Sequence, residues 1–383
     1  MQAVTTLADH HALQRRQIAT RVVFFIAGFG KAAWAPLVPF AKARLGVDDG
    51  TLGLLLLCLG AGSIVSMPFT GALAGRIGCR TVIVLSALLL CVGLPLLASV
   101  DGMPWFVVTL IVFGAAAGSI DVAMNIHAIA VERQGNRPVM SGFHGLYSVG
   151  GMAGAAGATA LLGLGATPFV ETLCVAGAMF VALLYAFPNL LADGEATSGP
   201  VFVRPHGIVL LIGALAFSVF LTEGAVLDWS GVFLTSIRGM APSYAGLGYA
   251  AFALTMTLGR LSGDRIVQRF GNLRVIGLGA LCAALGFGIA TLAPSWPFTL
   301  FGYALVGAGC SNIAPVLFTS AGRQTLMPHQ LAVSAITTLG YAGILAGPAA
   351  IGFISHMTSL TTAFLCVTVL LLGVSASARF LRV

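Results

Sequence analysis

Apolar residues run along this chain in stretches long enough to cross a membrane, with short polar segments between them. The stretch TVIVLSALLLCVGLPLLASV (residues 81–100) carries no charge over about 20 residues, the length that a helix needs to cross a hydrocarbon core of about 30 Å. A membrane β-barrel would instead show short segments of alternating hydrophobicity. The pattern therefore predicts an all-α membrane protein with twelve transmembrane helices. Their expected ranges are 20–41, 52–73, 80–99, 104–131, 141–163, 168–188, 207–231, 243–262, 274–293, 297–321, 330–354 and 359–379.

The composition agrees with this interpretation, because 58% of the 383 residues are hydrophobic and only 8% are charged. Ordinary soluble domains carry about 25% charged residues. The first 17 residues are polar and lead directly into an apolar stretch that further apolar stretches follow, so we expect no cleaved signal peptide. The first helix is then expected to direct insertion into the membrane.

The basic residues predict the orientation in the membrane. With a cytoplasmic N-terminus, fifteen of the 19 Lys and Arg residues fall inside, Lys42, Arg44 and Arg238 fall outside, and Lys31 lies within a span. This excess predicts that both termini are cytoplasmic. Because the arginines are spread over many loops, the net charge of +7 indicates anionic lipid headgroups as neighbours and not a nucleic acid. The fifteen are Arg15, Arg16, Arg21, Arg76, Arg80, Arg133, Arg137, Arg204, Arg260, Arg265, Arg269, Arg274, Arg323, Arg379 and Arg382.

The sequence lacks the motifs of an enzyme or of an ATP-driven pump. It contains no HExxH, GxSxG or phosphate-binding GxxxxGK[ST] pattern. Its seven cysteines have no spacing typical of a metal site or of a disulfide framework. We therefore expect no catalytic centre, no cofactor and no resident metal ion.

The two halves of the chain resemble each other. Residues from 141 onward match those from 334 onward at a spacing of 193, and the stretch GSIDVAMN (118–125) matches GCSNIAPV (309–316) at a spacing of 191. We expect six helices in residues 1–188, a linker at 189–206 and six helices in 207–383. Parallel halves of this kind are typical of transporters whose substrate site lies between them near mid-membrane. The matched pairs are Ser141 with Ser334, Gly150 with Gly343, Gly154 with Gly347, Asp121 with Asn312 and Trp34 with Trp229.

On these features the chain resembles the major facilitator superfamily. The loop GALAGRIGCR (71–80) is similar to the cytoplasmic signature of that family, although Gly75 stands where an acid is expected and Cys79 also departs from the pattern. The matching loop GRLSGDRIVQRFG (259–271) supplies the acid as Asp264. The resemblance implies that Arg76, Arg80, Asp264 and Arg265 form a cytoplasmic gate. The alternative is that they only anchor the topology.

Four further stretches resemble a bacterial subgroup that includes the rhizopine-associated membrane protein and lies near the fucose permeases. They are GFGKAAWAPLVPFAKARLG, DVAMNIHAIAVE, SGFHGLYSVGG and EGAVLDWSGVFL. This resemblance implies a sugar, polyol or similar small polar solute as cargo. We expect the carrier to be a monomer in the bacterial inner membrane, surrounded by lipid.

Charged residues inside spans are costly and usually face a partner or a cavity. Lys31 lies about 16 Å, and Asp121 about 15 Å, from the cytoplasmic ends of their helices at 1.5 Å per residue. Their equal depth predicts an ion pair. Asn125 shares a helix face with Asp121. We expect Asp121 and Glu223 to couple proton movement to transport, the alternatives being a static hydrogen bond for Asp121 and a wetter position for Glu223.

Several uncharged or less deeply placed residues are weaker candidates for substrate binding, alongside Lys31 and Asn125. Each has a structural alternative as a packing or interfacial residue. Glu171, His127 and His144 are interpreted as structural. The weaker candidates are Trp34, Tyr147, Asp228, Trp229, Asn312 and Tyr341.

These expectations together describe a secondary active transporter that works by alternating access, with protons as the coupling ion. A proton-driven efflux antiporter is the first alternative, but the Gly-Pro pair typical of such antiporters in the fifth helix is missing there and stands at Gly347-Pro348. A passive channel and an intramembrane enzyme are more distant alternatives.

Overall fold

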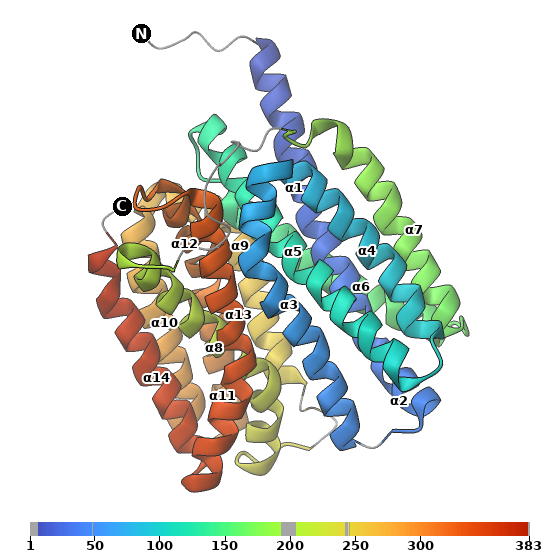
Figure 1. Ribbon diagram of the computed structural model, residues 1–383. Coiled ribbons are helices and arrows are strands. Elements are labelled where there is room, and N and C mark those ends of the chain that lie inside the picture. Colours follow the sequence, from blue (N-terminus) through green and yellow to red (C-terminus); the bar gives the residue numbers. More distant parts are fainter. Residues whose placement is uncertain (1–6, 48, 193–203, 242–243, 245, 382–383) are drawn as a thin grey trace. The chain divides into compact units, whose positions relative to one another are not determined.

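The computed structural model describes residues 7–47, 49–192, 204–241, 244 and 246–381, and all regular structure in these residues is helical. Of the predicted linker 189–206, residues 193–203 lie outside the described part. Figure 1 shows the helices in chain order. In the part of the first half that is described they are α1 (Leu7–Ala33), η1 (Ala35–Leu37), α2 (Val38–Leu45), α3 (Asp49–Ile77), α4 (Cys79–Ser99), α5 (Met103–Gly135), α6 (Met140–Gly163), α7 (Pro168–Ala186) and η2 (Phe187–Asn189).

The remaining helices follow the linker. They are α8 (Gly207–Ser236), α9 (Leu247–Phe270), α10 (Asn272–Leu292), α11 (Trp296–Cys310), α12 (Ile313–Arg323), α13 (His329–Met357), α14 (Leu360–Ser377) and η4 (Ala378–Phe380). Among the described residues, eleven segments are long and apolar enough to cross a membrane. The twelfth predicted span corresponds to α9, which is less apolar because Arg260, Asp264, Arg265 and Arg269 lie in its second half. The predicted all-helical architecture is confirmed.

Two of the predicted spans are interrupted, and prolines explain where. The first span breaks after α1 into the 3₁₀ turn Ala35–Leu37, which contains Pro36. The tenth span breaks between α11 and α12, at Ser311 and Asn312. Pro315 has no N–H, so it cannot donate the helical hydrogen bond to the carbonyl of Ser311 four residues earlier. The spans predicted at 20–41 and 297–321 are each present as one segment long enough to cross a membrane, with a break inside it.

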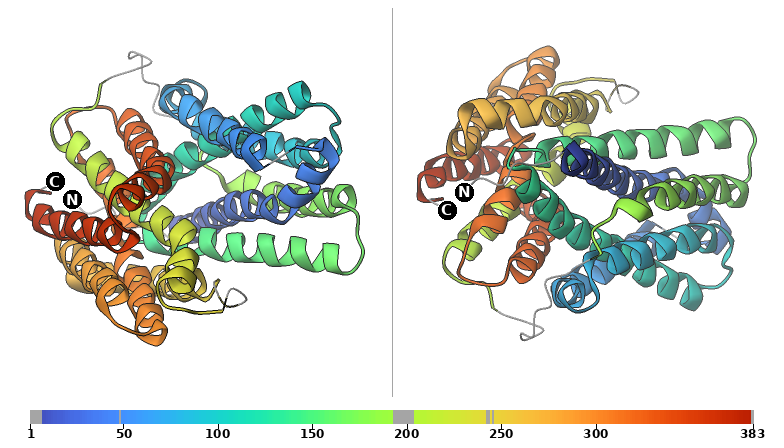
Figure 2. Two further views of the ribbon diagram at one scale, coloured as in Figure 1. Left: turned by 90° about the horizontal axis from the view of Figure 1, so that it is seen from below. Right: turned by 90° about the horizontal axis from the view of Figure 1, so that it is seen from above.

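Two compact units divide the chain, and each has its own packing. The first comprises Met1–Arg137 and Leu146–Arg204. In this unit α5 packs against α1, α3 and α4, and α7 packs against α1 and α4, as the two views of Figure 2 allow the reader to follow. The core between these helices is formed by fully buried apolar side chains such as Phe24, Phe106 and Phe113.

The second unit comprises Pro205–Val383 together with Pro138–Gly145, the segment that starts α6. In it α13 packs against α8, α12 and α14, while α10 packs against α11 and α14. Phe233, Phe287 and Phe364 stack or meet edge to face, with ring centroids 4.9 and 5.3 Å apart, and form a buried aromatic cluster.

The glycines of the predicted repeat share one structural task. A Cβ atom added at Gly150 of α6 would collide with the carbonyl of Phe25 in α1, and one at Gly343 of α13 would collide with the carbonyl of Phe217 in α8. Small residues at such positions let two helix backbones approach closely in a membrane. The second pair of glycines behaves in the same way, since Gly154 and Gly347 face the backbones of Phe29 and Leu221.

We predict that Gly150→Ala destabilises the protein by roughly 1–3 kcal/mol, the usual cost of overpacking, because backbone and not a flexible side chain blocks the new methyl group. Gly157→Ala in the same helix is the matched control, since nothing lies within 4 Å of its Cβ position. Its stability should equal or exceed that of the wild type. Thermal unfolding of the purified variants measures both effects, and equal stability of the two variants would contradict the close approach of α1 and α6.

Candidate functional site

A buried ion pair joins α1 to α5 in the first unit. The Nζ atom of Lys31 lies 2.7 Å from both carboxylate oxygens of Asp121. The two side chains are only 16% and 7% exposed. The structure thus contains the pair that equal depth in the membrane predicts. An ammonium that donates to both oxygens of one carboxylate makes a charge-assisted contact of high strength.

An aromatic ring completes this cluster. The ring centre of Tyr147, on α6, lies 4.7 Å from the Lys31 ammonium, within the range of a cation–π interaction. Gly28 makes this approach possible, because a Cβ there would collide with the backbone carbonyl of Tyr147. The candidate residues Lys31, Asp121 and Tyr147 therefore form one group, supplied by three helices.

Two glycines of α5, Gly114 and Gly118, form a packing surface. A Cβ at Gly114 or Gly118 would meet the backbone of α3, and Ser63 of α3 donates its hydroxyl to the carbonyl of Gly114 at 2.7 Å. One turn after Asp121, Asn125 is buried, and its amide donates to the backbone carbonyl of Asp121 at 2.8 Å. This hydrogen bond fixes the Asn125 side chain beside the ion pair.

The second unit holds an ion pair of its own. The Nη2 atom of Arg260, on α9, lies 3.3 Å from Oε1 of Glu223, on α8. The side chains are 8% and 19% exposed. Glu223 is thus a largely buried carboxylate with a cationic neighbour, an arrangement that resembles the first unit in charge but uses different helices.

The break between α11 and α12 gives Arg260 a second partner. Pro315 leaves the carbonyl of Ser311 without its helical donor, and Nε of Arg260 donates to that oxygen at 3.3 Å. The amide of Asn312 donates to the carbonyl of Gly259 and to Oγ of Ser311, both at 3.0 Å. The break, the arginine and the asparagine therefore stabilise one another.

Glycines on α9 make room for this network. A Cβ at Gly259 would collide with the Ser311 side chain, and one at Gly263 would collide with the Asn312 side chain. The side-chain amide oxygen of Asn312, Oδ1, is buried and has no hydrogen-bond partner among the described residues. Asn312 is thus placed at a helix junction.

Arg260 requires a correction. The basic-residue count placed it among the cytoplasmic anchors, whereas the structure buries it, with 6% of its surface exposed. The signal was present in the sequence, because position 260 lies inside the predicted span 243–262. Position 260 lies near the end of that span, where a basic residue is also typical of a cytoplasmic anchor.

Asp264 contacts a helix N-terminus. Its Oδ1 accepts a hydrogen bond of 3.0 Å from the backbone N–H of Gly142, the third residue of α6. The first N–H groups of a helix have no partner within the helix and carry partial positive charge, so a carboxylate is favourable there. Both residues belong to the second unit.

The other predicted gate residues are divided between the units, since Arg76 and Arg80 belong to the first and Arg265 to the second. Arg265 and Arg76 are exposed, and no ion pair within the described part of the chain involves either of them. The guanidinium of Arg80 lies 5.0 Å from the ring centre of Phe187. Each arginine therefore stands in a local environment of its own.

The remaining candidates differ in burial. Trp34 is buried, with its ring 6.2 Å from that of Phe106, and its indole N–H has no described hydrogen-bond partner. Trp229 is half-buried beside Gly352. Asp228 is exposed, and Tyr341 is half-buried on α13.

Two of the residues interpreted as structural have local contacts. The Nε2 atom of His127 accepts from the backbone N–H of Leu191 at 3.0 Å, and His144 stacks on Phe318 with ring centres 5.6 Å apart. Glu171 lies in the first turn of α7 and is fully buried, and its carboxylate oxygens have no hydrogen-bond partner in the part of the chain that the structure describes. Among the described residues, no group of three His, Cys, Asp or Glu side chains could hold a metal ion.

Comparisons with known proteins place the fold and the sequence in one family. The family model described as Major Facilitator Superfamily matches residues 22–237. An uncharacterized MFS-type transporter of Yersinia pestis is 56% identical over 365 residues, which cover 95% of each chain. The membrane protein MosC of Rhizobium meliloti is 32% identical over 89% of this chain and 84% of its own length.

Among solved structures, the fucose:proton symporter FucP of E. coli aligns with a TM-score of 0.76, covering 96% of this chain and 98% of that one at 18% identity. At this identity the likeness shows the fold alone. The family consists of transporters and not of enzymes, as the absence of catalytic motifs led us to expect. The chain belongs to the major facilitator superfamily and is a multi-pass membrane protein of the secondary transporter class.

Proposed function

We propose that this transporter couples proton movement to the transport of a small polar solute, such as a sugar or a polyol, and that Asp121 and Glu223 carry the protons. The supporting observation is that both carboxylates are largely buried and that each lies beside a cation within its own unit. Charged side chains in a membrane protein interior are usually retained for transport, relay or binding.

The Lys31–Asp121 pair suggests how the coupling works. While Asp121 is ionised, it holds the Lys31 ammonium at 2.7 Å. A proton bound by Asp121 neutralises the carboxylate and removes this attraction, so the ammonium can donate to hydroxyl oxygens of a cargo molecule. Tyr147, whose ring already lies against the ammonium, then offers an aromatic face to the apolar side of the cargo.

The same reasoning applies to the second unit with a different outcome. A proton on Glu223 weakens its contact with Arg260, but Arg260 keeps its hydrogen bond to the carbonyl of Ser311. Protonation would therefore act on the junction between α11 and α12. We further propose cargo contacts for Asn125, Asn312, Tyr341, Asp228, Trp34 and Trp229.

The mechanism proposed is alternating access of two halves, residues 1–188 and 207–383, joined by a linker at 189–206. The hydrogen bond between Gly142 and Asp264 is the proposed gate contact, with Arg76, Arg80 and Arg265 as basic residues on the same cytoplasmic side. The orientation with both termini in the cytoplasm of a bacterium rests on the distribution of basic residues. A monomer is sufficient for this mechanism.

A proton-driven efflux antiporter remains the second candidate. The Gly-Pro pair typical of such antiporters would lie in α6, but α6 contains no proline, and the pair Gly347-Pro348 lies in α13 instead. This difference favours uptake over efflux. The fucose:proton symporter that shares the fold supports uptake of a sugar-like cargo. A thermal-shift screen against sugars, polyols, amines and organic acids, followed by uptake into proteoliposomes with and without a proton gradient, tests cargo and coupling separately. Cargo uptake unaffected by the gradient would contradict proton coupling.

The ion pair in the first unit predicts a strong non-additivity in stability. Asp121→Ala should lower the free energy of unfolding by roughly 3–5 kcal/mol, because it leaves a buried ammonium without its counter-ion. The double variant Lys31→Met/Asp121→Ala should regain most of that loss but not transport. Unfolding of the wild type, both single variants and the double variant gives the coupling energy, and additive losses would argue against the pair.

If these carboxyls carry the coupled protons, removing them should affect accumulation driven by a proton gradient but not cargo exchange without a gradient. Asp121→Asn and Glu223→Gln should each abolish cargo accumulation driven by a proton gradient. Both variants should still exchange cargo across the membrane, because the replaced carboxyls carry only protons. The control is Asp101→Asn, because the Asp101 side chain is 85% exposed. Normal accumulation by both of the buried-site variants would exclude these two carboxyls as proton carriers.

The contact of Asp264 with α6 predicts that its charge keeps Ser141 protected. Ser141 is 2% exposed, so a cysteine introduced there in a cysteine-free background should react slowly with a thiol reagent. Asp264→Asn removes the attraction to the helix N-terminus and should accelerate labelling by about twofold to thirtyfold, given that such attractions amount to about 0.3–1 kcal/mol when exposed and up to about 2 kcal/mol when partly buried. A cysteine at Ser320, which is 4% exposed on α12, is the control whose labelling should not change.

A further inference from the structure

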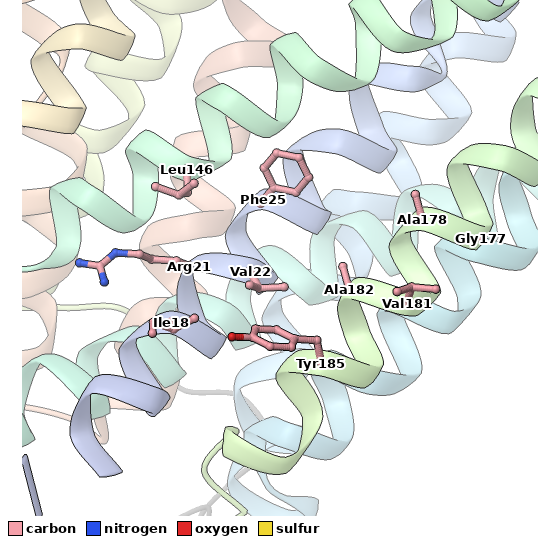
Figure 3. Close-up of a pocket in the computed structure, with 10 residues that line it drawn as sticks. All are labelled: Ile18, Arg21, Val22, Phe25, Leu146, Gly177, Ala178, Val181, Ala182 and Tyr185. Atoms are coloured by element: carbon pink, nitrogen blue, oxygen red, sulfur yellow. The ribbon is translucent and has the colours of Figure 1, made fainter. Parts of the chain in front are cut away.

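An apolar groove opens on the first unit between α1 and α7. Its volume is about 700 Å³, within the range of small-molecule sites, and Figure 3 shows it bordered by Ile18, Val22 and Phe25 on one side and by Gly177, Ala178 and Ala182 on the other. Leu146 of α6 closes it near Phe25. None of the residues of the two proposed proton sites lines this groove.

Small residues on α7 create the groove. Gly177 and Ala178 present almost no side chain on a helix whose other outward residues are large, such as Val181 at 66% exposure. Nothing lies within 4 Å of the position that a Cβ of Gly177 would take. Because α1 and α7 are both long and apolar enough to cross a membrane, an apolar groove between them suits contact with lipid.

Arg21 and Tyr185 are the polar side chains that border the groove. Figure 3 shows Ile18 and Tyr185 at one end and Phe25 with Gly177 at the other, with the hydroxyl of Tyr185 pointing towards α1 and the guanidinium of Arg21 extending away from α7. The length from Gly177 to Tyr185 is about 12 Å at 1.5 Å per residue, close to half of the ~30 Å hydrocarbon thickness. The groove therefore has the length of one leaflet.

We infer that this groove binds an anionic phospholipid, with one acyl chain between α1 and α7 and the phosphate at the end that carries Arg21 and Tyr185. The apolar lining suits an acyl chain and does not suit a sugar or polyol. Arginine side chains extend along apolar surface to place the charged group at the interface, and basic pockets between transmembrane helices bind anionic headgroups. Arg15 and Arg16, further towards the N-terminus of α1, add positive charge at the same end.

Native mass spectrometry of the purified protein with equal amounts of palmitoyl-oleoyl phosphatidylglycerol and phosphatidylcholine tests this inference. The wild type should retain more phosphatidylglycerol. Arg21→Gln should reduce that preference about fivefold, the factor typical of one basic residue near a membrane surface. Gly177→Leu should fill the groove and reduce the binding of both lipids.

Two matched variants control for general effects. Arg274→Gln removes an exposed arginine that does not line the groove, and Gly373→Leu enlarges another exposed helical glycine with nothing within 4 Å of its Cβ position. Both should bind lipid like the wild type, and the melting temperature of Gly177→Leu in detergent should not fall.

Three results would overturn the inference. Wild-type lipid retention by Gly177→Leu would show that the groove does not hold the chain. An equal loss of preference in Arg274→Gln and Arg21→Gln would reduce the effect to net charge. A wild-type dimer that Gly177→Leu converts to a monomer would assign the groove to a second copy of the protein.

Discussion

The cost of placing charge in an apolar membrane is the constraint on which the arrangement of this protein depends. A lysine, an arginine, an aspartate and a glutamate lie buried in spans or in α9, and each is neutralised within its own unit. The charges of Lys31 and Asp121 compensate each other between α1 and α5, and those of Glu223 and Arg260 do so between α8 and α9. These two pairs therefore keep four buried charges compensated, each pair within its own unit.

The close approach of helices makes such pairing possible. Tyr147 reaches the Lys31 ammonium because α6 lies against α1 at Gly28, and Arg260 reaches Ser311 and Glu223 because Gly259 and Gly263 leave space on α9. In lipid, association of helices gains little from hydrophobic burial and depends on packing and hydrogen bonds. Glycines at these contacts thus decide which polar groups can meet.

The sequence predicted the twelve helices and the Lys31–Asp121 pair, because span length and depth follow from the rise per residue alone. It did not predict the Glu223–Arg260 pair, because Arg260 near the end of a span counts equally well as a cytoplasmic anchor. The junction at Ser311 and Asn312 was also missed. Its cause, the missing donor of Pro315, is visible in the sequence, but whether a proline kinks, breaks or is tolerated in a span depends on neighbours that refill the lost hydrogen bond.

The internal repeat preserves packing more faithfully than charge. Gly150 and Gly343 each allow a neighbouring helix backbone to approach closely in their own unit. Asp121 and its counterpart Asn312 have different contacts. Asp121 pairs with a cation beside an aromatic ring, while Asn312 donates to Gly259 and Ser311 at a helix junction. In the second unit the carboxylate stands on α8 instead, at Glu223. Duplicated helices must keep the small residues that allow their contact, but a buried charge can move to another helix provided that its counter-ion moves with it. The two carboxylates are therefore not interchangeable copies, since Asp121 pairs with an ammonium and Glu223 with a guanidinium that also binds a backbone carbonyl.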